Sequence, residues 1–355
     1  MKYKWIIVLL GMVACRQAEP VTESARPVSQ ADQILFEMAR TYLFPLPKDA
    51  ADEEHPLSPE LVKLGRALYL EKGLSKDGTV SCNSCHPLDQ YGVNDTPLSE
   101  GIGHRLGARN SPTTFNAALY LAQFWDGRAK TVEEQVEGPL LNPVEMGMPS
   151  KKAVVRRLRA DSQYVALFAQ AFPSSKEINF TQVARAIGAF ERTLMTPSRL
   201  DKYLEGDVGA LTEKEKSGLK NMLDFGCIPC HSGATMGGAM YQKFGLFADY
   251  RSYTGSRPGD QGRLSVTHQS QDEDVYKVPS LRNITHTAPY FHDGSVDQLE
   301  EAVRVMAQLQ LGRELTDEQV EDIVAFLEVS SDWSEEAYRN LGRTMEKSKP
   351  KTTQY

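Results

Sequence analysis

Two short cysteine and histidine motifs carry the chemistry of this chain. They read Cys82-Asn83-Ser84-Cys85-His86 and Cys227-Ile228-Pro229-Cys230-His231. In such a motif the two thiols form thioethers to the vinyl groups of a haem, and the histidine that follows then lies beneath the iron as its proximal ligand. Because the chain has only 5 cysteines and 7 histidines, two such motifs indicate two covalently bound haem c groups.

Two other interpretations of the cysteine pairs are a zinc site and redox dithiols. Together the pairs would supply four thiolates to a zinc ion, or each pair would form a redox dithiol. Zinc binding leaves the histidine after each pair without a role, and neither pair stands in the strand-to-helix setting typical of a redox dithiol. Haem attachment accounts for every residue of both motifs.

Helices must position both motifs, since each follows a segment with a helical pattern. The first segment covers residues 61–71, and the second covers 212–225, where Thr212 and Glu215 form a capping box. Apolar residues at helical spacing predict further helices at 299–309 and 316–329. Since Gly and Pro cluster between helices and alternating β-branched runs are few, we expect a mainly α protein with long loops. Because loops this long are unusual without a ligand, they favour a cofactor-organised fold.

Length and net charge limit the number of domains and the classes of partner that the chain can have. The 355 residues exceed what one hydrophobic core usually spans, so two domains are expected. With 40 basic against 47 acidic residues the net charge is -7, which argues against a nucleic-acid partner. A basic protein partner or a small neutral substrate fits this charge better.

The N-terminus has the layout of an export signal. Lys2 and Lys4 precede an apolar run at 5–13, which is too short to span a bilayer, and small residues follow it. We therefore expect residues 1–15 to be an export signal and the protein to be periplasmic. The run ending at Cys15 also resembles a bacterial lipoprotein box, in which that cysteine would bear a lipid anchor.

Polar composition marks the segments that flank the folded part. Residues 16–34 are rich in Glu, Pro, Ser and Gln and predict a flexible tether, and residues 331–355 predict a disordered tail.

Beyond the two haem motifs, the chain resembles the bacterial di-haem cytochrome c peroxidases and their relatives that oxidise protein side chains. The resemblance covers about residues 35–329 and rests on segments in the same order along the chain. These segments are Gly103-His104, Arg109-Asn110-Ser111-Pro112-Thr113, Gln123-Phe124-Trp125-Asp126-Gly127-Arg128, Pro143-Val144-Glu145-Met146, Val278-Pro279-Ser280-Leu281-Arg282-Asn283 and Pro289-Tyr290-Phe291-His292-Asp293-Gly294.

The resemblance implies a fold of two cytochrome c-like helical domains, each carrying one haem. Residues 35–200 would form the N-terminal peroxidatic domain and residues 201–330 the C-terminal electron-transfer domain. The last helix would return toward the first domain.

The resemblance also implies roles for residues around the N-terminal haem. His104 would be its second axial ligand in the resting oxidised state, on a glycine-rich segment that can move at low backbone cost. Trp125 would lie between the haems, and Glu145 would be the distal carboxylate that moves a proton during O–O cleavage. Gln135 would line the same pocket.

Around the C-terminal haem, the matching sixth ligand is Met306, whose thioether raises a haem potential. Its place on the apolar face of the predicted helix 299–309 is equally typical of a core methionine. The family also binds calcium between its domains, through groups that match the Asn110 side chain and the carbonyl oxygens of Thr287 and Pro289.

The function implied is reduction of hydrogen peroxide to water with electrons from a small cytochrome c or cupredoxin, by a protein that forms dimers. One alternative is an enzyme that oxidises protein side chains, whose best-known branch has tyrosine in place of the methionine ligand. Another is a di-haem electron carrier without peroxidase activity.

Overall fold

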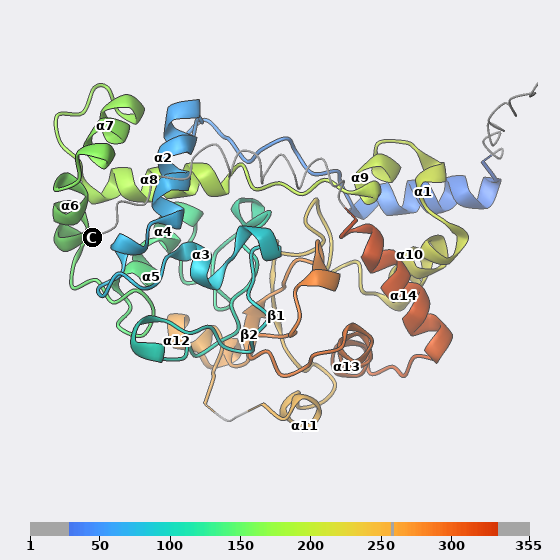
Figure 1. Ribbon diagram of the computed structural model, residues 1–355. Coiled ribbons are helices and arrows are strands. Elements are labelled where there is room, and N and C mark those ends of the chain that lie inside the picture. The colour runs from blue at the N-terminus through green and yellow to red at the C-terminus, as the bar shows by residue number, and fades with distance from the viewer. Residues whose placement is uncertain (1–27, 257–258, 333–355) are drawn as a thin grey trace, which may run out of the picture.

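Helices and long loops make up most of the protein in the computed structural model (Figure 1), which describes residues 28–256 and 259–332. The mainly α prediction is confirmed. The α-helices are α1 Gln30–Tyr42, α2 Pro59–Leu70, α3 Cys82–Cys85, α4 Val132–Gln135, α5 Glu137–Leu141, α6 Lys151–Arg159, α7 Ser162–Ala171, α8 Phe180–Glu191, α9 Arg199–Leu204, α10 Glu213–Phe225, α11 Arg251–Thr254, α12 Leu264–Thr267, α13 Leu299–Leu311 and α14 Asp317–Val329. The strands are β1 Tyr241–Lys243 and β2 Val275–Lys277.

The first hydrophobic core lies where α2 crosses α8. Gly65 in α2 permits this crossing, because a Cβ at that position would stand 1.7 Å from the Ala186 carbonyl oxygen and 2.9 Å from the Phe190 side chain. Leu64 and Leu68 are fully buried beside this crossing. The close approach fixes the helix that precedes the first cysteine motif.

A second core is built in the same way around α10 and α14. A Cβ at Gly218 would stand 1.9 Å from the Asp322 carbonyl oxygen and 2.8 Å from the Phe326 side chain. Thr212 and Glu215 form the predicted capping box at the start of α10. The helix ends at Gly226, whose φ of 92° only glycine adopts readily, and the second cysteine motif begins at the next residue.

The first and last described helices, α1 and α14, both pack in the second core. The α1 helix begins at Gln30, inside the predicted tether, and its Phe36 and Ala39 are buried in the second core rather than the first. The α14 helix packs on α10 within the same core. In both helices the apolar face is buried against the neighbouring helices of the second unit.

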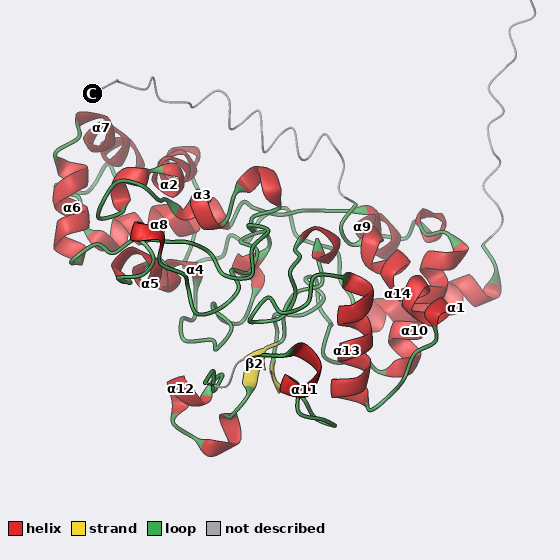
Figure 2. Ribbon diagram, turned by 60° about the horizontal axis from the view of Figure 1, so that its bottom comes forward, coloured by secondary structure: helices red, strands yellow, loops and turns green. Residues whose placement is uncertain are grey.

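Loops fill the space between the two helical groups (Figure 2). The antiparallel pair of β1 and β2 lies among them, with Gln242 opposite Tyr276 in the register. No helix within the described ranges has the length and apolar character needed to cross a membrane. The predicted export signal, Cys15 and most of the predicted tail lie outside those ranges.

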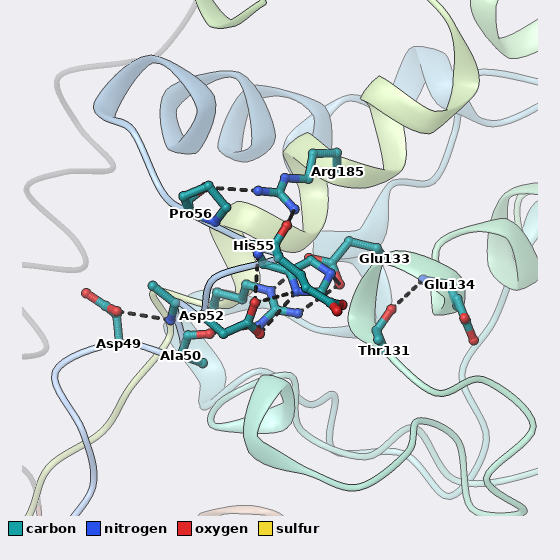
Figure 3. A network of polar contacts seen from close by, with 12 residues as sticks. Asp49, Ala50, Asp52, His55, Pro56, Thr131, Glu133, Glu134 and Arg185 are labelled. Carbon is teal, nitrogen blue, oxygen red and sulfur yellow. Dashed lines mark hydrogen bonds and ion pairs between the residues drawn. The ribbon is translucent and has the colours of Figure 1, made fainter.

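A polar network ties the chain entering the first unit to α4 and the end of α8 (Figure 3). The guanidinium of Arg192 donates to Glu133 at 2.8 Å and to the Ala50 carbonyl at 2.7 Å. His55 Nδ1 lies 2.8 Å from Asp52, whose other oxygen accepts from Arg192 at 3.2 Å. The Arg192 ion pair holds the pKa of Glu133 below its usual value against the opposing effect of burial. This network anchors α4, whose last residue is Gln135.

Candidate functional site

The first cysteine motif opens onto a cavity of ≈ 620 Å³. Cys82, Cys85 and His86 all line it. The Nδ1 atom of His86 lies 3.2 Å from the Gly92 carbonyl oxygen, so Nδ1 carries the proton and Nε2 is left to act as a ligand. Burial lowers the pKa of His86, which keeps the imidazole neutral as metal ligation requires.

The second motif repeats this arrangement around a cavity of ≈ 260 Å³ lined by Cys227, Cys230 and His231. His231 Nδ1 lies 3.3 Å from the Met236 carbonyl oxygen. Burial lowers the pKa of His231 to about 4. Met306 from α13 lines the same cavity, and most of the remaining wall is aliphatic or aromatic.

Both cavities therefore fit a covalently attached haem. Each has two unbridged thiols at its wall and a neutral histidine whose Nε2 is free. A protein with two such cavities belongs to the class of di-haem c-type cytochromes.

A thin partition separates the two cavities, and Trp125 is part of it. Trp125 and residues 110–113 line both cavities. The indole Nε1 donates to the Asn110 carbonyl oxygen at 2.9 Å, and the Asn110 N–H donates to the His292 carbonyl oxygen at 2.8 Å. Segments far apart in sequence thus fix the tryptophan between the two sites.

Glu145 lies in the first cavity together with Gln135. Its Oε1 accepts from Asn142 Nδ2 at 2.6 Å. Burial raises the pKa of Glu145, although the Asn142 hydrogen bond opposes this effect. A carboxyl group with a raised pKa at the wall of a cavity suits proton transfer.

His104 lies outside the first cavity. Its side chain is 91% exposed, and Nδ1 lies 3.0 Å from Glu100 Oε2. The preceding Gly103 has a φ of 62°, a conformation that glycine adopts readily. The His104 segment is nevertheless tied to the Glu145 segment, because Ile102 N–H donates to the Glu145 carbonyl oxygen at 2.8 Å.

The residues matched to a calcium site come together at the second cavity. Asn110, Thr287 and Pro289 all line it. Asn110 Nδ2 lies 3.3 Å from the carbonyl oxygens of both Thr96 and Pro97, which sets the orientation of its amide.

Sequence reasoning missed an ion-pair cluster at the first cavity. Arg109 donates to Asp260 through Nε at 2.6 Å and Nη2 at 2.7 Å, and to Asp126 through Nη1 at 2.7 Å. Arg128 donates to the same Asp126. Arg109 and Asp126 stood in motifs noted for the resemblance, but Asp260 carried no local signal.

Two buried charged residues were also missed. Glu191, at the end of α8, lines the first cavity, and burial raises its pKa to about 8. Lys277, at the end of β2, lines the second cavity, and burial lowers its pKa to about 8. Neither residue stands in a pattern that marks it as buried.

Comparison with known proteins places the chain in a family. Residues 59–209 match the family described as di-haem cytochrome c peroxidase. The chain is 43% identical over 306 residues to the cytochrome c551 peroxidase of Pseudomonas aeruginosa, covering 85% of this chain and 88% of that protein. It is 42% identical over 274 residues to the cytochrome c551 peroxidase of Nitrosomonas europaea, covering 77% and 80%.

A solved structure is similar as well. A MauG-like protein associated with microbial copper homeostasis superposes with a TM-score of 0.73 at 30% identity, over 81% of this chain and 93% of that one. The chain belongs to the di-haem cytochrome c peroxidase family. It is accordingly a peroxidase of the oxidoreductase class that carries two haem c groups.

Proposed function

We propose that this enzyme reduces hydrogen peroxide in the first cavity with electrons that enter through the second. The observation that carries this division is the difference between the two cavity walls. The first contains a half-buried carboxyl group, Glu145, beside the cysteine motif, whereas no Asp or Glu among the described residues lines the second, which has Met306 instead. Proton transfer therefore belongs to the first cavity and electron entry to the second.

Glu145 is the proposed proton carrier. Peroxide takes up two protons and two electrons and leaves as two waters, and cleavage of its O–O bond is easier when a proton reaches the departing oxygen. Haem bound at His86 supplies the iron that binds peroxide and the electrons that reduce it. Glu145, oriented by Asn142, takes a proton from the inner oxygen and delivers it to the outer one. Gln135 lines the same space and is proposed to orient the substrate.

His104 is proposed to close the first cavity in the resting oxidised protein. The exposed position of the side chain corresponds to the open arrangement, in which peroxide can enter. Closing the site requires residues 101–105 to move, which would break the Ile102 bond to Glu145 and the Arg105 bond to the Pro143 carbonyl. Access to the cavity and placement of Glu145 are therefore coupled in this proposal.

The second cavity is proposed to receive electrons through a haem ligated by His231 and Met306. A thioether ligand favours the reduced state of the iron, as an electron acceptor needs. Trp125, in the partition between the cavities, is the proposed relay between the haems. The net charge of -7 favours a basic donor, either a small cytochrome c or a cupredoxin.

The location and assembly of the protein are further parts of the proposal. We propose a periplasmic enzyme, exported by residues 1–15, with a lipid anchor at Cys15 and a dimeric state as in its family. We also propose one calcium ion at Asn110, Thr287 and Pro289. The two cores support an N-terminal unit within residues 35–200 and a C-terminal unit within 201–330, the latter joined by α1.

Oxidation of a protein side chain is the alternative activity. The MauG-like structure supports it at 30% identity, below the 43% of the cytochrome c551 peroxidase. The best-known protein-oxidising branch carries tyrosine as the second-haem ligand, whereas the position here is Met306. The methionine favours the peroxidase.

The proposed function is tested by steady-state turnover with peroxide and a reduced small cytochrome c. We expect two donor molecules to be oxidised for each peroxide consumed, with a rate that falls as salt screens the donor encounter. A protein that holds two haems and oxidises no donor would be a carrier and not a peroxidase.

A further inference from the structure

Lys277 places a buried ammonium group at the wall of the second cavity. The residue is 5% exposed and ends β2, where it pairs with Tyr241 of β1. Its N–H donates to the Trp125 carbonyl oxygen at 2.8 Å, which fixes the backbone beside the partition between the cavities. The side-chain Nζ lies 4.3 Å from the ring centroid of Tyr120, which lines the same cavity.

The described residues give this charge no counter-ion. No Asp or Glu lines the second cavity, and no ion pair of Lys277 is formed within residues 28–256 and 259–332. The other basic side chain at the wall, Arg282, is already paired with Asp201 at 2.7 Å. Contact with the face of an aromatic ring stabilises a desolvated cation by about 2 kcal/mol, whereas moving an ion from water into the protein interior costs several kcal/mol. The Tyr120 ring therefore does not compensate the buried charge.

An unpaired buried cation that faces a cavity indicates an anionic occupant. Haem carries two propionate carboxylates, and the cysteine motif at Cys227 and Cys230 would bring one haem into this cavity. The absence of acidic residues along the described wall leaves those carboxylates as the natural partners of the Lys277 charge.

We propose that the ammonium of Lys277 binds a propionate of the C-terminal haem and keeps the reduction potential of that haem high. This inference rests on the proposed function, in which the second cavity holds the haem that accepts electrons. A cation beside a redox centre favours the reduced form, because reduction lowers the positive charge of the iron. Without Lys277, an uncompensated propionate would favour the oxidised form.

Redox titration of the holoprotein tests this role with two matched variants. Lys277→Gln removes the buried charge, and Lys243→Gln removes an exposed lysine from the paired strand β1. We expect Lys277→Gln to lower the higher midpoint potential by at least about 59 mV. For a one-electron couple this corresponds to a tenfold smaller equilibrium constant for reduction. The lower potential, and both potentials in Lys243→Gln, should stay at wild-type values.

A third variant separates charge from packing. Lys277→Arg keeps the charge. The equilibrium constant for reduction of the higher-potential haem should therefore stay within tenfold of the wild-type value. If Lys277→Gln loses the C-terminal haem on mass analysis while Lys277→Arg keeps it, the charge is required for haem retention and the proposal stands. Loss of the haem in both variants, or an equal fall in potential in both, would trace the effect to packing and overturn it.

Other outcomes separate this inference from the proposed function. An unmoved higher potential in Lys277→Gln with both haems present overturns the inference. A shift of the lower potential alone would also overturn the inference, because the propionate affected by Lys277 would then belong to the haem of the first cavity. If Met306→His still lowers the higher potential, the electron-entry assignment survives that failure.

Discussion

The indole of Trp125 is hydrogen bonded to the Asn110 carbonyl oxygen at 2.9 Å, and both residues line both cavities. An aromatic side chain held in this way touches each site without belonging to either. Trp125→Phe keeps an aromatic ring but loses the Nε1 donor and part of the ring. We expect slower electron transfer between the haems with both haems retained, measured by stopped-flow spectroscopy after one-electron reduction. An unchanged transfer rate would reduce Trp125 to a packing residue.

His104→Ala should leave the N-terminal haem open in the oxidised protein, because it removes the proposed blocking ligand. Electron paramagnetic resonance of the oxidised variant should lose a low-spin signal that the wild type shows. His268→Ala, which also removes an exposed histidine, is the control and should keep that signal. An identical low-spin spectrum for His104→Ala would mean that another group, or none, closes the site.

Gly218→Ala should destabilise the second unit, because its Cβ would meet the Asp322 carbonyl oxygen at 1.9 Å. Overpacking of this kind typically costs about 1–3 kcal/mol, and contact with backbone leaves little room for relief. Thermal unfolding of the holoprotein should show a lowered midpoint. Ser217→Ala, at the neighbouring exposed position of α10, is the control and should show little change. Equal midpoints for the two variants would contradict this account of the helix crossing.

Local signals explain what could be predicted from the sequence. The cysteine motifs, the capping box at Thr212 and the apolar spacing of 316–329 each depend on a few neighbouring residues, and the helices begin and end close to the expected positions. The packing of α1 on the second core depends on contacts between distant segments, and no local pattern reports them.

The residues of the candidate site also divide into those that a local sequence pattern marks and those that only distant contacts place. Glu145, Gln135 and Met306 were expected from motif matches, and the structure places each at a cavity wall. The burial of Lys277 could not be predicted, because a lysine at the end of a three-residue strand is ordinarily solvated. The exposed position of His104 could not be predicted either, because no local pattern reports how its glycine-rich loop packs.

Met306→His should lower the higher of two well-separated haem potentials, since imidazole stabilises the oxidised iron more than a thioether does. The lower potential serves as the internal reference. Turnover with donor cytochrome should fall, because the enzyme is expected to need reduction of this haem before it reacts with peroxide. An unmoved higher potential would make Met306 a core residue of α13 and remove the electron-entry assignment.

The most direct test of the account measures peroxide turnover in Glu145→Gln, because this carboxyl group distinguishes the proposed peroxide site. Glu145 lines the first cavity, whereas Glu137 lies outside it, half-exposed on α5 and paired with Lys151, so Glu137→Gln is the matched control. Both variants should retain two haems. We predict that Glu145→Gln loses turnover by roughly 10²–10⁴ while Glu137→Gln stays near the wild-type rate. Near-wild-type turnover in Glu145→Gln would contradict the assignment of peroxide reduction to this site.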